Sequence, residues 1–295
     1  PEPPAVEPGP HCRKPFECEF YHLCNPPKPV DWIGHLPGVG PVKAEKYEDQ
    51  GIAVISDLPA DARLNPKQQR ARSSVQSGKA DFGSKLAGVL AGLEYPLFFM
   101  DFETHAPALP WYAGMHPYEK FPFQWSVHVQ RQPGAELEHH EYLPETADDP
   151  REEFTRSLLD VLGTSGHIVV YNQGFERGCL EALARWLPSH GDRIEQVLPR
   201  FWDLLPVLRN YVYHPAFKGS FSLKAVLPAL VPEMTYDGME VSGGSEAGPA
   251  WAALVRGAVP AAEQRRVHEA LLAYCCQDTL AMVKLVEVLH SECMA

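Results

Sequence analysis

The sequence predicts an α/β fold in which a mixed sheet is flanked by helices, and the order of its apolar stretches supports this. Residues 96–103, 123–131 and 137–143 have the patterns of strands. Helical periodicity follows at 150–162, then the apolar strand HIVVY, and then a second helix at 174–187. This order suits a mixed sheet with helices on its faces. Further helices are expected at 203–213, 222–230, about 249–257 and about 260–290.

Composition sets limits on the kind of protein this is. A chain of 295 residues with 45% apolar residues can build one large domain or two unequal ones. The formal net charge of −12 argues against a generally basic, nucleic-acid-binding surface. Residues 28–88, however, carry nine Lys/Arg against seven Asp/Glu. A nucleic-acid partner would therefore be held by local basic residues, by metal ions or by another domain.

Cysteine usage and the chain start indicate the compartment. Seven cysteines, two of them adjacent, do not form a disulfide framework, so a reducing cytoplasmic setting is expected. No signal peptide is visible, and the longest apolar runs are too short to span a bilayer, so no membrane association is expected. Because the sequence begins PEPPAVEPGP without Met, it is expected to be part of a longer protein.

Residues 1–27 are expected to be a Pro-rich linker and a cysteine segment, the tail of an upstream domain. Cys12, Cys18 and Cys24 recur at intervals of six residues, with His11 and His22 nearby. Thiolates at such spacing can hold zinc or an iron–sulfur cluster. The alternative is a short loop with unligated thiols.

Residues 28–60 contain LPGVG and predict a helix-hairpin-helix segment of two short helices around a glycine turn. Gly38 and Gly40 permit a tight turn that exposes backbone N–H groups to phosphate, and Lys43 on the next helix adds positive charge. The alternative is that this hairpin only packs domains together. Residues 61–92 include the basic stretch NPKQQRARSSVQSGK, interpreted as a short helix and a solvated linker into the main domain at 93–295.

Two acidic pairs are the most informative feature. Asp101 and Glu103 lie two apart in a strand and therefore share a face, as do Tyr274 and Asp278, four apart in a helix. Carboxylates gathered at a sheet would repel one another unless divalent cations lay among them, which is a two-metal phosphoryl-transfer site in outline.

Each of these residues also has a structural alternative. Glu176, at a strand-to-helix junction with Asn172, could be a solvated residue of a first helical turn. Tyr274 could be a core residue, and Lys224 could face a phosphate or be a surface lysine. Asp203 is a rival fourth acid, although an N-cap explains it more simply. The run GGSEAG at 243–248 is interpreted as a flexible turn.

The order of these motifs resembles the DEDD exonuclease superfamily, which has a ribonuclease H-like fold, and the Tyr-x-x-x-Asp motif resembles its DEDDy branch. The likeness runs from about Leu97 to Leu289, with Glu176 where the superfamily usually has Asp. It implies two Mg²⁺ or Mn²⁺ ions, with Tyr274 orienting the attacking water. The implied metal ligands are Asp101, Glu103, Glu176 and Asp278.

The chain also resembles a bacterial family known only as a domain of unknown function. The resemblance lies in three stretches, YNQGFERG, YVYHPAFKGSFSLKAVLPALVP and AYCCQDTLAM. Members of that family are commonly fused behind a RecB-like nuclease. The resemblance implies that Cys12, Cys18 and Cys24 are three ligands of a 4Fe–4S cluster completed by an upstream cysteine.

The resulting hypothesis is a metal-dependent 3′-to-5′ exonuclease or related phosphodiesterase acting on nucleic acid, with DNA favoured over RNA. The alternative is a catalytically weak or inactive DNA-binding scaffold within a larger RecB-like nuclease. Tight Mn²⁺ binding would separate the two, because a scaffold does not require it. The expected nucleic-acid contacts are Gly38, Gly40, Lys43, Asn172 and Lys224.

Overall fold

The centre of the protein is a five-stranded mixed sheet. The computed structural model describes residues 9–12, 14, 16, 18–24, 27–241 and 243–294. The strand order is β4-β3-β2-β5-β6, with β2 antiparallel to β3, β3 antiparallel to β4, and the pairs β2–β5 and β5–β6 parallel. The strands are β2 (Leu97–His105), β3 (Phe121–Gln130), β4 (Leu137–Tyr142), β5 (Ile168–Val170) and β6 (Phe201–Asp203).

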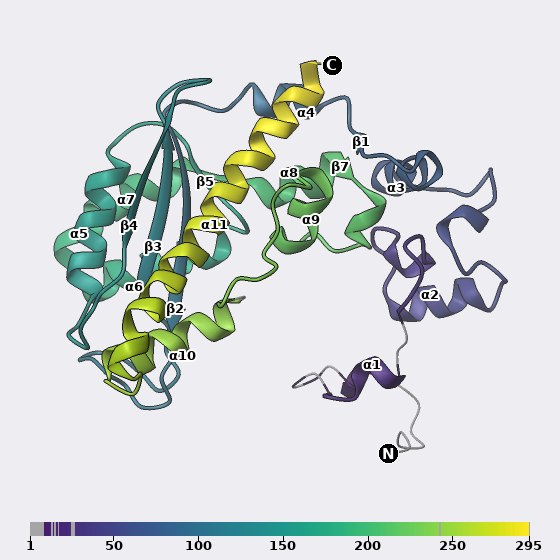
Figure 1. Ribbon diagram of the computed structural model, residues 1–295. Helices are drawn as coiled ribbons and strands as arrows, with labels where there is room; N and C mark the ends of the chain where they lie inside the picture. Colours follow the sequence, from purple (N-terminus) through teal and green to yellow (C-terminus); the bar gives the residue numbers. More distant parts are fainter. Residues whose placement is uncertain are drawn as a thin grey trace.

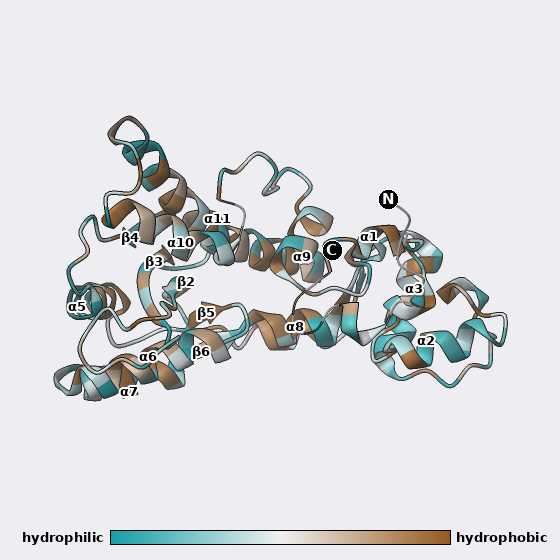
Figure 2. Cartoon of the chain, turned by 90° about the horizontal axis from the view of Figure 1, so that it is seen from below, coloured by the Kyte–Doolittle hydropathy of each residue, from teal (hydrophilic) through white to brown (hydrophobic). Residues whose placement is uncertain are grey.

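Helices cover both faces of this sheet, as Figure 1 and the view from below in Figure 2 show. Helices α5 (Arg151–Leu162), α6 (Gly174–Trp186) and α7 (Gly191–Val197) pack on one face. The other face is covered by α8 (Leu204–Tyr211), α9 (Leu223–Leu230), α10 (Gly244–Val255) and α11 (Ala261–Met294). The predicted mixed sheet flanked by helices is therefore confirmed.

The pleat of β2 divides its side chains between two hydrophobic cores. Phe98, Met100 and Phe102 pack with α5, α6 and α7, whereas Leu97 and Phe99 pack with the helices of the opposite face. Successive strand residues point to opposite faces, so Asp101 and Glu103 continue the Leu97 and Phe99 row toward α11. A register shift, a β-bulge or similar irregularity, lies between Glu103 and Thr104.

The sequence missed β6 and α7, and it was wrong about residues 243–248. Strand β6 has only three residues, too few for a clear alternation. Residues 243–248, interpreted as a flexible turn, are the N-cap and first turn of α10. Glycine suits this helix because a Cβ at position 248 would lie 2.8 Å from the carbonyl oxygen of Thr104. Close approach of the helix to β2 therefore explains the glycine.

A smaller helical unit precedes the sheet. It contains the 3-10 turn η2 (Ile33–His35), α2 (Pro41–Glu48), the 3-10 turn η3 (Ile55–Asp57) and α3 (Pro66–Ser77). Its core includes Ile33, Leu36, Ala44, Ile55 and Ala71, and it reaches the main domain through Tyr213. The first of the two expected helices is thus a single 3-10 turn, and α2 is the second.

Residues 61–92, interpreted as a helix followed by a solvated linker, are largely folded. Helix α3 begins with a capping box between Asn65 and Gln68. Strand β1 (Asp81–Phe82) pairs with β7 (Val212–Tyr213), and α4 (Leu86–Leu90) joins the core beneath α11. Three apolar residues of this stretch, Ala71, Leu86 and Leu90, are buried, but polar neighbours hide their periodicity.

The N-terminal segment is described only in part. It includes the 3-10 turn η1 (Pro10–Cys12) and α1 (Tyr21–Cys24). Most of the expected Pro-rich linker, residues 1–8, lies outside the described residues, as do residues 13, 15, 17, 25 and 26 of the cysteine segment. Within the described ranges, every helix is too short or too polar to cross a lipid bilayer.

Candidate functional site

Three of the predicted carboxylates meet between β2 and α11. Asp101, Glu103 and Asp278 each offer a carboxylate oxygen, and these oxygens lie within 4.8 Å of one another. The strand supplies two acids from one face, and α11 packs over that face with Asp278 directed toward it. The shared-face arguments from the sequence therefore describe this part of the site correctly.

Burial and mutual repulsion raise the pKa values of these acids. The pKa of Asp101 lies well above its ordinary range because of burial and the charges of Asp278, Glu103 and Glu176. Burial, then the charge of Asp278, raises the pKa of Glu103 to about 8, against a lowering influence from Lys224. The pKa of Asp278 is also raised, chiefly by burial. The cluster therefore favours a bound proton or a cation.

Two tyrosines hold Asp278 in place. The Tyr236 hydroxyl donates to Asp278 Oδ1 at 2.5 Å, and the Tyr274 hydroxyl also hydrogen-bonds this carboxylate. Burial and the nearby acids raise the pKa of Tyr274, so its hydroxyl keeps its proton at neutral pH. Sequence reasoning missed Tyr236, because nothing in its local pattern links it to a residue 42 positions later.

Lys224 lies beside these acids. It lies in the first turn of α9, and its ammonium is 5.3 Å from the Tyr236 ring centroid and 5.2 Å from that of Tyr274. Its charge lowers the pKa values of Glu103 and Asp278, in opposition to burial. Lys224 thus contributes positive charge beside the carboxylate cluster.

Glu176 lies close to the three carboxylates without belonging to their group. It is in the first turn of α6, is 2% exposed, and its Oε2 has no hydrogen-bond partner among the described residues. Burial, with a contribution from the charge of Asp203, raises its pKa to about 8. Its own charge raises the pKa of Asp101. Glu176 therefore has an oxygen available for a ligand beside the cluster.

The turn before α6 explains Asn172 and Asp203. Asn172 is exposed and has a left-handed backbone with a φ of 72°. The Asp203 carboxylate accepts hydrogen bonds from the backbone N–H groups of Asn172, Gln173 and Leu205. Asp203 is the N-cap of α8, which confirms the simpler of its two interpretations. With its oxygens used in this way, it supports the turn that presents Glu176.

The N-terminus of α10 closes one side of the cluster. A Cβ at Gly244 would lie 3.3 Å from Glu103 Oε2, so the first turn of this helix directly borders that carboxylate. On another side, a cavity of about 250 Å³ opens onto the site. Its lining includes Asp101, Tyr171, Ser222, Lys224, Tyr274 and Asp278.

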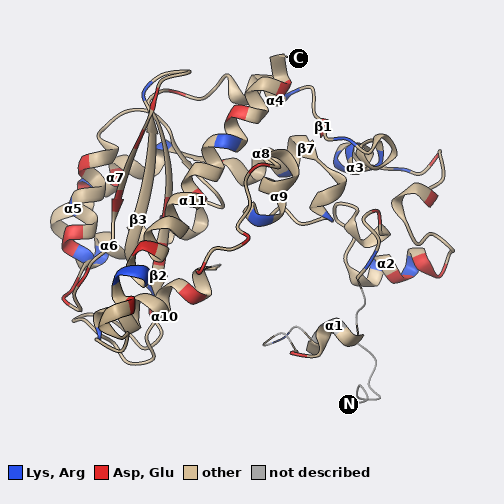
Figure 3. Cartoon of the chain, viewed as in Figure 1, with Lys and Arg blue, Asp and Glu red and all other residues tan. Residues whose placement is uncertain are grey.

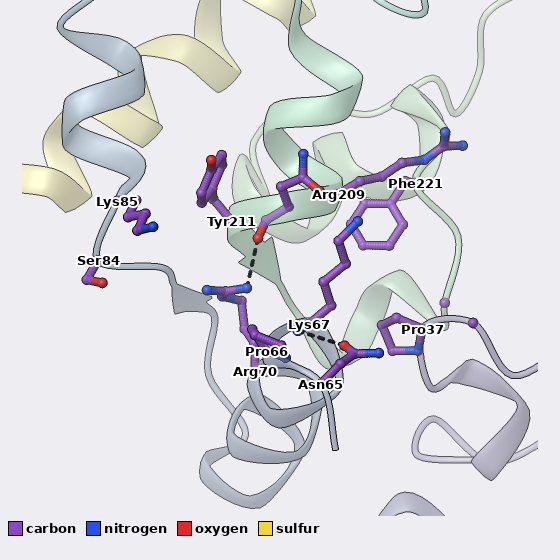
Figure 4. Close-up of a pocket in the computed structure, with 13 residues that line it drawn as sticks. Pro37, Asn65, Pro66, Lys67, Arg70, Ser84, Lys85, Arg209, Tyr211 and Phe221 are labelled. Atoms are coloured by element: carbon purple, nitrogen blue, oxygen red, sulfur yellow. Dashed lines mark hydrogen bonds between the residues drawn. The ribbon is translucent and has the colours of Figure 1, made fainter. Parts of the chain in front are cut away.

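A larger cavity, of about 930 Å³, lies where the small helical unit meets the main domain (Figure 4). Four basic side chains line this cavity, which we call the basic cavity: Lys67, Arg70, Lys85 and Arg209. Helix α3, which supplies two of them, carries Lys and Arg but no acid, as Figure 3 shows. The Arg70 guanidinium already has protein partners: its Nε lies 3.3 Å from Asp81 Oδ1, and its Nη1 donates to the Asn210 carbonyl.

The two cavities adjoin at one short loop. Phe221 lines the basic cavity, and the next residue, Ser222, lines the cavity at the carboxylates. The Tyr171 hydroxyl donates to the Phe221 carbonyl, which fixes this loop to the end of β5. Arg209 also lines the basic cavity. Burial raises the pKa of Tyr171, and the charge of Arg209 opposes that shift, so Arg209 lies near this tyrosine. The sequence gave no indication of this cavity, because its cations lie far apart in the chain.

The glycine loop borders the same basic cavity. Gly38, with a φ of 77°, lines it, and Gly40 is the N-cap of α2. Both glycines are exposed. Lys43 is exposed as well, and its ammonium donates to the Gly38 carbonyl at 3.4 Å.

The cysteine trio is not gathered into a ligand set within the described part of the chain. Cys18 is exposed, and Cys12 and Cys24 are partly exposed. Two groups of possible metal ligands occur among the described residues, the carboxylates above and a histidine–cysteine group, and the trio belongs to neither. A cluster completed by an upstream ligand stays a prediction.

Comparison with known proteins gives one match. Residues 98–222 match a family described as Domain of unknown function (DUF2779). The matched stretch contains Asp101, Glu103 and Glu176 and ends before Tyr236, Tyr274 and Asp278. Searches of curated proteins and of solved structures found no match. The match agrees with the resemblance to a family of unknown function and assigns no activity.

The raised pKa values predict an unusual dependence of stability on pH. Between about pH 4.5 and 8, Glu103 and Glu176 bind more protons in the folded chain than in the unfolded chain. Stability should therefore fall as pH rises through this window. In urea titrations with a chelator present, we expect Glu103→Gln to lose less stability than wild type between pH 5 and 8. Glu136→Gln, at an exposed acid, should follow wild type.

Proposed function

We propose that this protein is a metal-dependent 3′-to-5′ exonuclease, or a related phosphodiesterase, that acts on nucleic acid, with DNA favoured. The observation that carries the proposal is the convergence of three carboxylates, those of the buried Glu103 and Asp278 and of the partly exposed Asp101. Their oxygens lie within 4.8 Å of one another and their pKa values are raised. Such a cluster is costly unless cations neutralise it. A mixed sheet with Asp101 and Glu103 on a central strand, and Asp278 on the helix packed over it, also supports the ribonuclease H-like assignment.

The residues present fit two Mg²⁺ or Mn²⁺ ions. Carboxylate oxygens are the ligands these hard cations prefer, and Glu176 Oε2 is a buried oxygen without a hydrogen-bond partner among the described residues. The ions would be held by Asp101, Glu103, Glu176 and Asp278. When bound, the ions lower the pKa of the attacking water and stabilise the leaving 3′ oxygen.

The surrounding side chains have separate roles in this proposal. The Tyr274 hydroxyl, which keeps its proton, orients the attacking water by hydrogen bonding. Tyr236 holds Asp278 through a short hydrogen bond and so fixes the direction of that ligand. The ammonium of Lys224 attracts the scissile phosphate. The exposed Asn172 contacts the end of the nucleic acid.

The basic cavity would bind the part of the nucleic acid that lies beyond the reacting phosphate. A chain with net charge −12 needs such a local concentration of cations to bind a polyanion. Lys67, Lys85 and Arg209 would bind backbone phosphates, and the loop at Phe221 and Ser222 leads from them to the carboxylates. Gly38, Gly40 and Lys43, in the proposed helix-hairpin-helix segment, would extend this contact without reading sequence. DNA is favoured on that basis.

Two further parts of the proposal concern the longer protein. An upstream RecB-like nuclease domain would complete a 4Fe–4S cluster with Cys12, Cys18 and Cys24. Zinc is the alternative for these thiolates. Elemental analysis of anaerobically purified full-length protein for iron, sulfide and zinc tests this part, independently of any nuclease assay.

The activity itself is tested with end-labelled single- and double-stranded DNA and RNA in the presence of Mn²⁺. We expect stepwise release of nucleoside 5′-monophosphates from the 3′ end by wild type. Asp101→Asn should abolish it, because removing that charge disrupts the binding of both ions. If wild type neither binds Mn²⁺ nor cleaves any of the four substrates, the protein is a nucleic-acid-binding scaffold.

Tyr274→Phe separates a mechanistic role from a packing role. The ring still packs, the four carboxylates remain and Tyr236 still donates its short hydrogen bond to Asp278, so KM and Mn²⁺ affinity should hardly change. The loss of one positioned hydroxyl should lower kcat by about 10²–10⁴. Tyr236→Phe removes the other hydroxyl on Asp278 and should mainly weaken Mn²⁺ binding. Full activity in Tyr274→Phe would show that Tyr274 is only a core residue.

Arg209→Ala and Lys67→Ala test the basic cavity. Each should raise KM and leave kcat nearly unchanged, because the cavity does not contact the reacting phosphate. Each should also reduce the slope of log affinity against log salt by about 1, as expected for one lost phosphate contact. Arg265→Ala, which removes a 90% exposed side chain on α11, is the matched control. Equal effects of Arg209→Ala and Arg265→Ala would exclude the cavity as a binding site.

A further inference from the structure

A second group of possible ligands lies under α11, beside the carboxylates but different in chemistry. His128 on β3, His139 on β4 and Cys276 on α11 each offer one ligand atom, and these atoms lie within 4.8 Å of one another. The two histidines are cross-strand partners in the β3–β4 ladder. Their rings stack with centroids 4.4 Å apart. Three separate elements thus bring two imidazoles and a thiol together.

Hydroxyl groups hold both imidazole rings in place. Thr279 Oγ1 is 2.8 Å from His128 Nδ1, and Ser126 Oγ is 2.9 Å from His139 Nε2. The two hydroxyls are themselves 2.9 Å apart. Metal-binding histidines commonly have one ring nitrogen fixed in this way, because the bond sets the tautomer and leaves the other nitrogen for the ion. Here His128 Nε2 and His139 Nδ1 are the nitrogens left for a ligand.

The position of Cys276 separates this group from the carboxylates. Cys275, its neighbour, points its Sγ toward Asp101, at 3.7 Å from the carbonyl oxygen and 3.9 Å from Oδ2. Successive helix residues are rotated by about 100°, so Cys276 faces β3 and β4 instead. Ser126, which supports His139, is the cross-strand partner of Asp101. The two groups are therefore neighbours on one sheet face, separated by the paired hydroxyls.

We propose that His128, His139 and Cys276 bind a structural Zn²⁺ ion. Two imidazole nitrogens and one thiolate are the borderline-soft ligands that zinc prefers, whereas the neighbouring carboxylates suit Mg²⁺ or Mn²⁺. Bond lengths of about 2.0–2.3 Å place tetrahedral ligands roughly 3.3–3.8 Å apart, so small side-chain rotations close the set. A water molecule would fill the fourth position.

The proposed ion would stabilise the packing of α11 against the sheet. It would tie α11 to β3 and β4 at a residue two positions before Asp278. Zinc would thereby fix the position of α11 and, with it, the direction of Asp278 and Tyr274. The proposal does not depend on the nuclease hypothesis, since a scaffold could use the same tie.

The test uses Co²⁺ as a spectroscopic substitute for Zn²⁺. The full chain is prepared with Cys12, Cys18 and Cys24 all replaced by Ser, and Mg²⁺ is present in excess to compete for the carboxylates. We expect one equivalent of Co²⁺ to produce a sulfur-to-cobalt charge-transfer band and intense tetrahedral ligand-field bands, and Zn²⁺ to displace it. Cys276→Ser should lose the charge-transfer band. Cys293→Ser, the matched control, should retain it.

Further variants separate this site from the carboxylates and from simple unfolding. Thr279→Val should weaken Zn²⁺ binding by about 10–100-fold, the usual effect of removing a hydrogen bond to a ligand. Asp101→Asn should leave the cobalt spectrum unchanged. If circular dichroism shows that Cys276→Ser is unfolded, His139→Asn takes its place, with loss of Zn²⁺ affinity expected. Absence of the band in the parent chain, or its persistence in folded Cys276→Ser, would overturn the proposal.

Discussion

Repulsion among buried carboxylates is the constraint on which the rest of the structure depends. Asp101, Glu103 and Asp278 have oxygens within 4.8 Å of one another, and each is placed there by an element with little freedom to move. Strand β2 lies inside the sheet with a hydrophobic core against each face. Removing charged groups from water is costly, and placing like charges together adds to that cost. The two cores supply the rigidity that keeps the acids from relaxing apart.

The polar groups around the cluster reduce this cost in different ways. Tyr236 and Tyr274 donate hydrogen bonds to Asp278, and Lys224 places a positive charge nearby. The first turn of α10 approaches Glu103, where the positive end of the helix dipole favours an acid. Glu176 has similar support from α6. None of these groups replaces a cation fully, since the pKa values of all four acids remain raised.

Local periodicity explains why the sequence predicted the acids. A spacing of two in a strand and of four in a helix determines which side chains share a face, so both acidic pairs could be read directly. Tyr236 and the basic cavity depend on contacts between distant segments, and no local pattern encodes those. Lys67, Lys85 and Arg209, for example, come from α3, from the residue before α4 and from α8. Strand β6 was missed because a parallel neighbour, β5, defines it more than its own three residues do.

The irregularity after Glu103 has a consequence for how this protein can vary in length. Before this irregularity, side chains of β2 alternate regularly between the two faces of the sheet. One face receives Leu97, Phe99, Asp101 and Glu103. A single inserted or deleted residue there would exchange acids for aromatic side chains on both faces. After the irregularity, the pairing of β2 with β3 has shifted. The positions of Thr104 and His105 therefore do not depend on the alternation before it. The loop between β2 and β3 can therefore gain or lose residues, and change what lies at the rim, while the acids stay where they are.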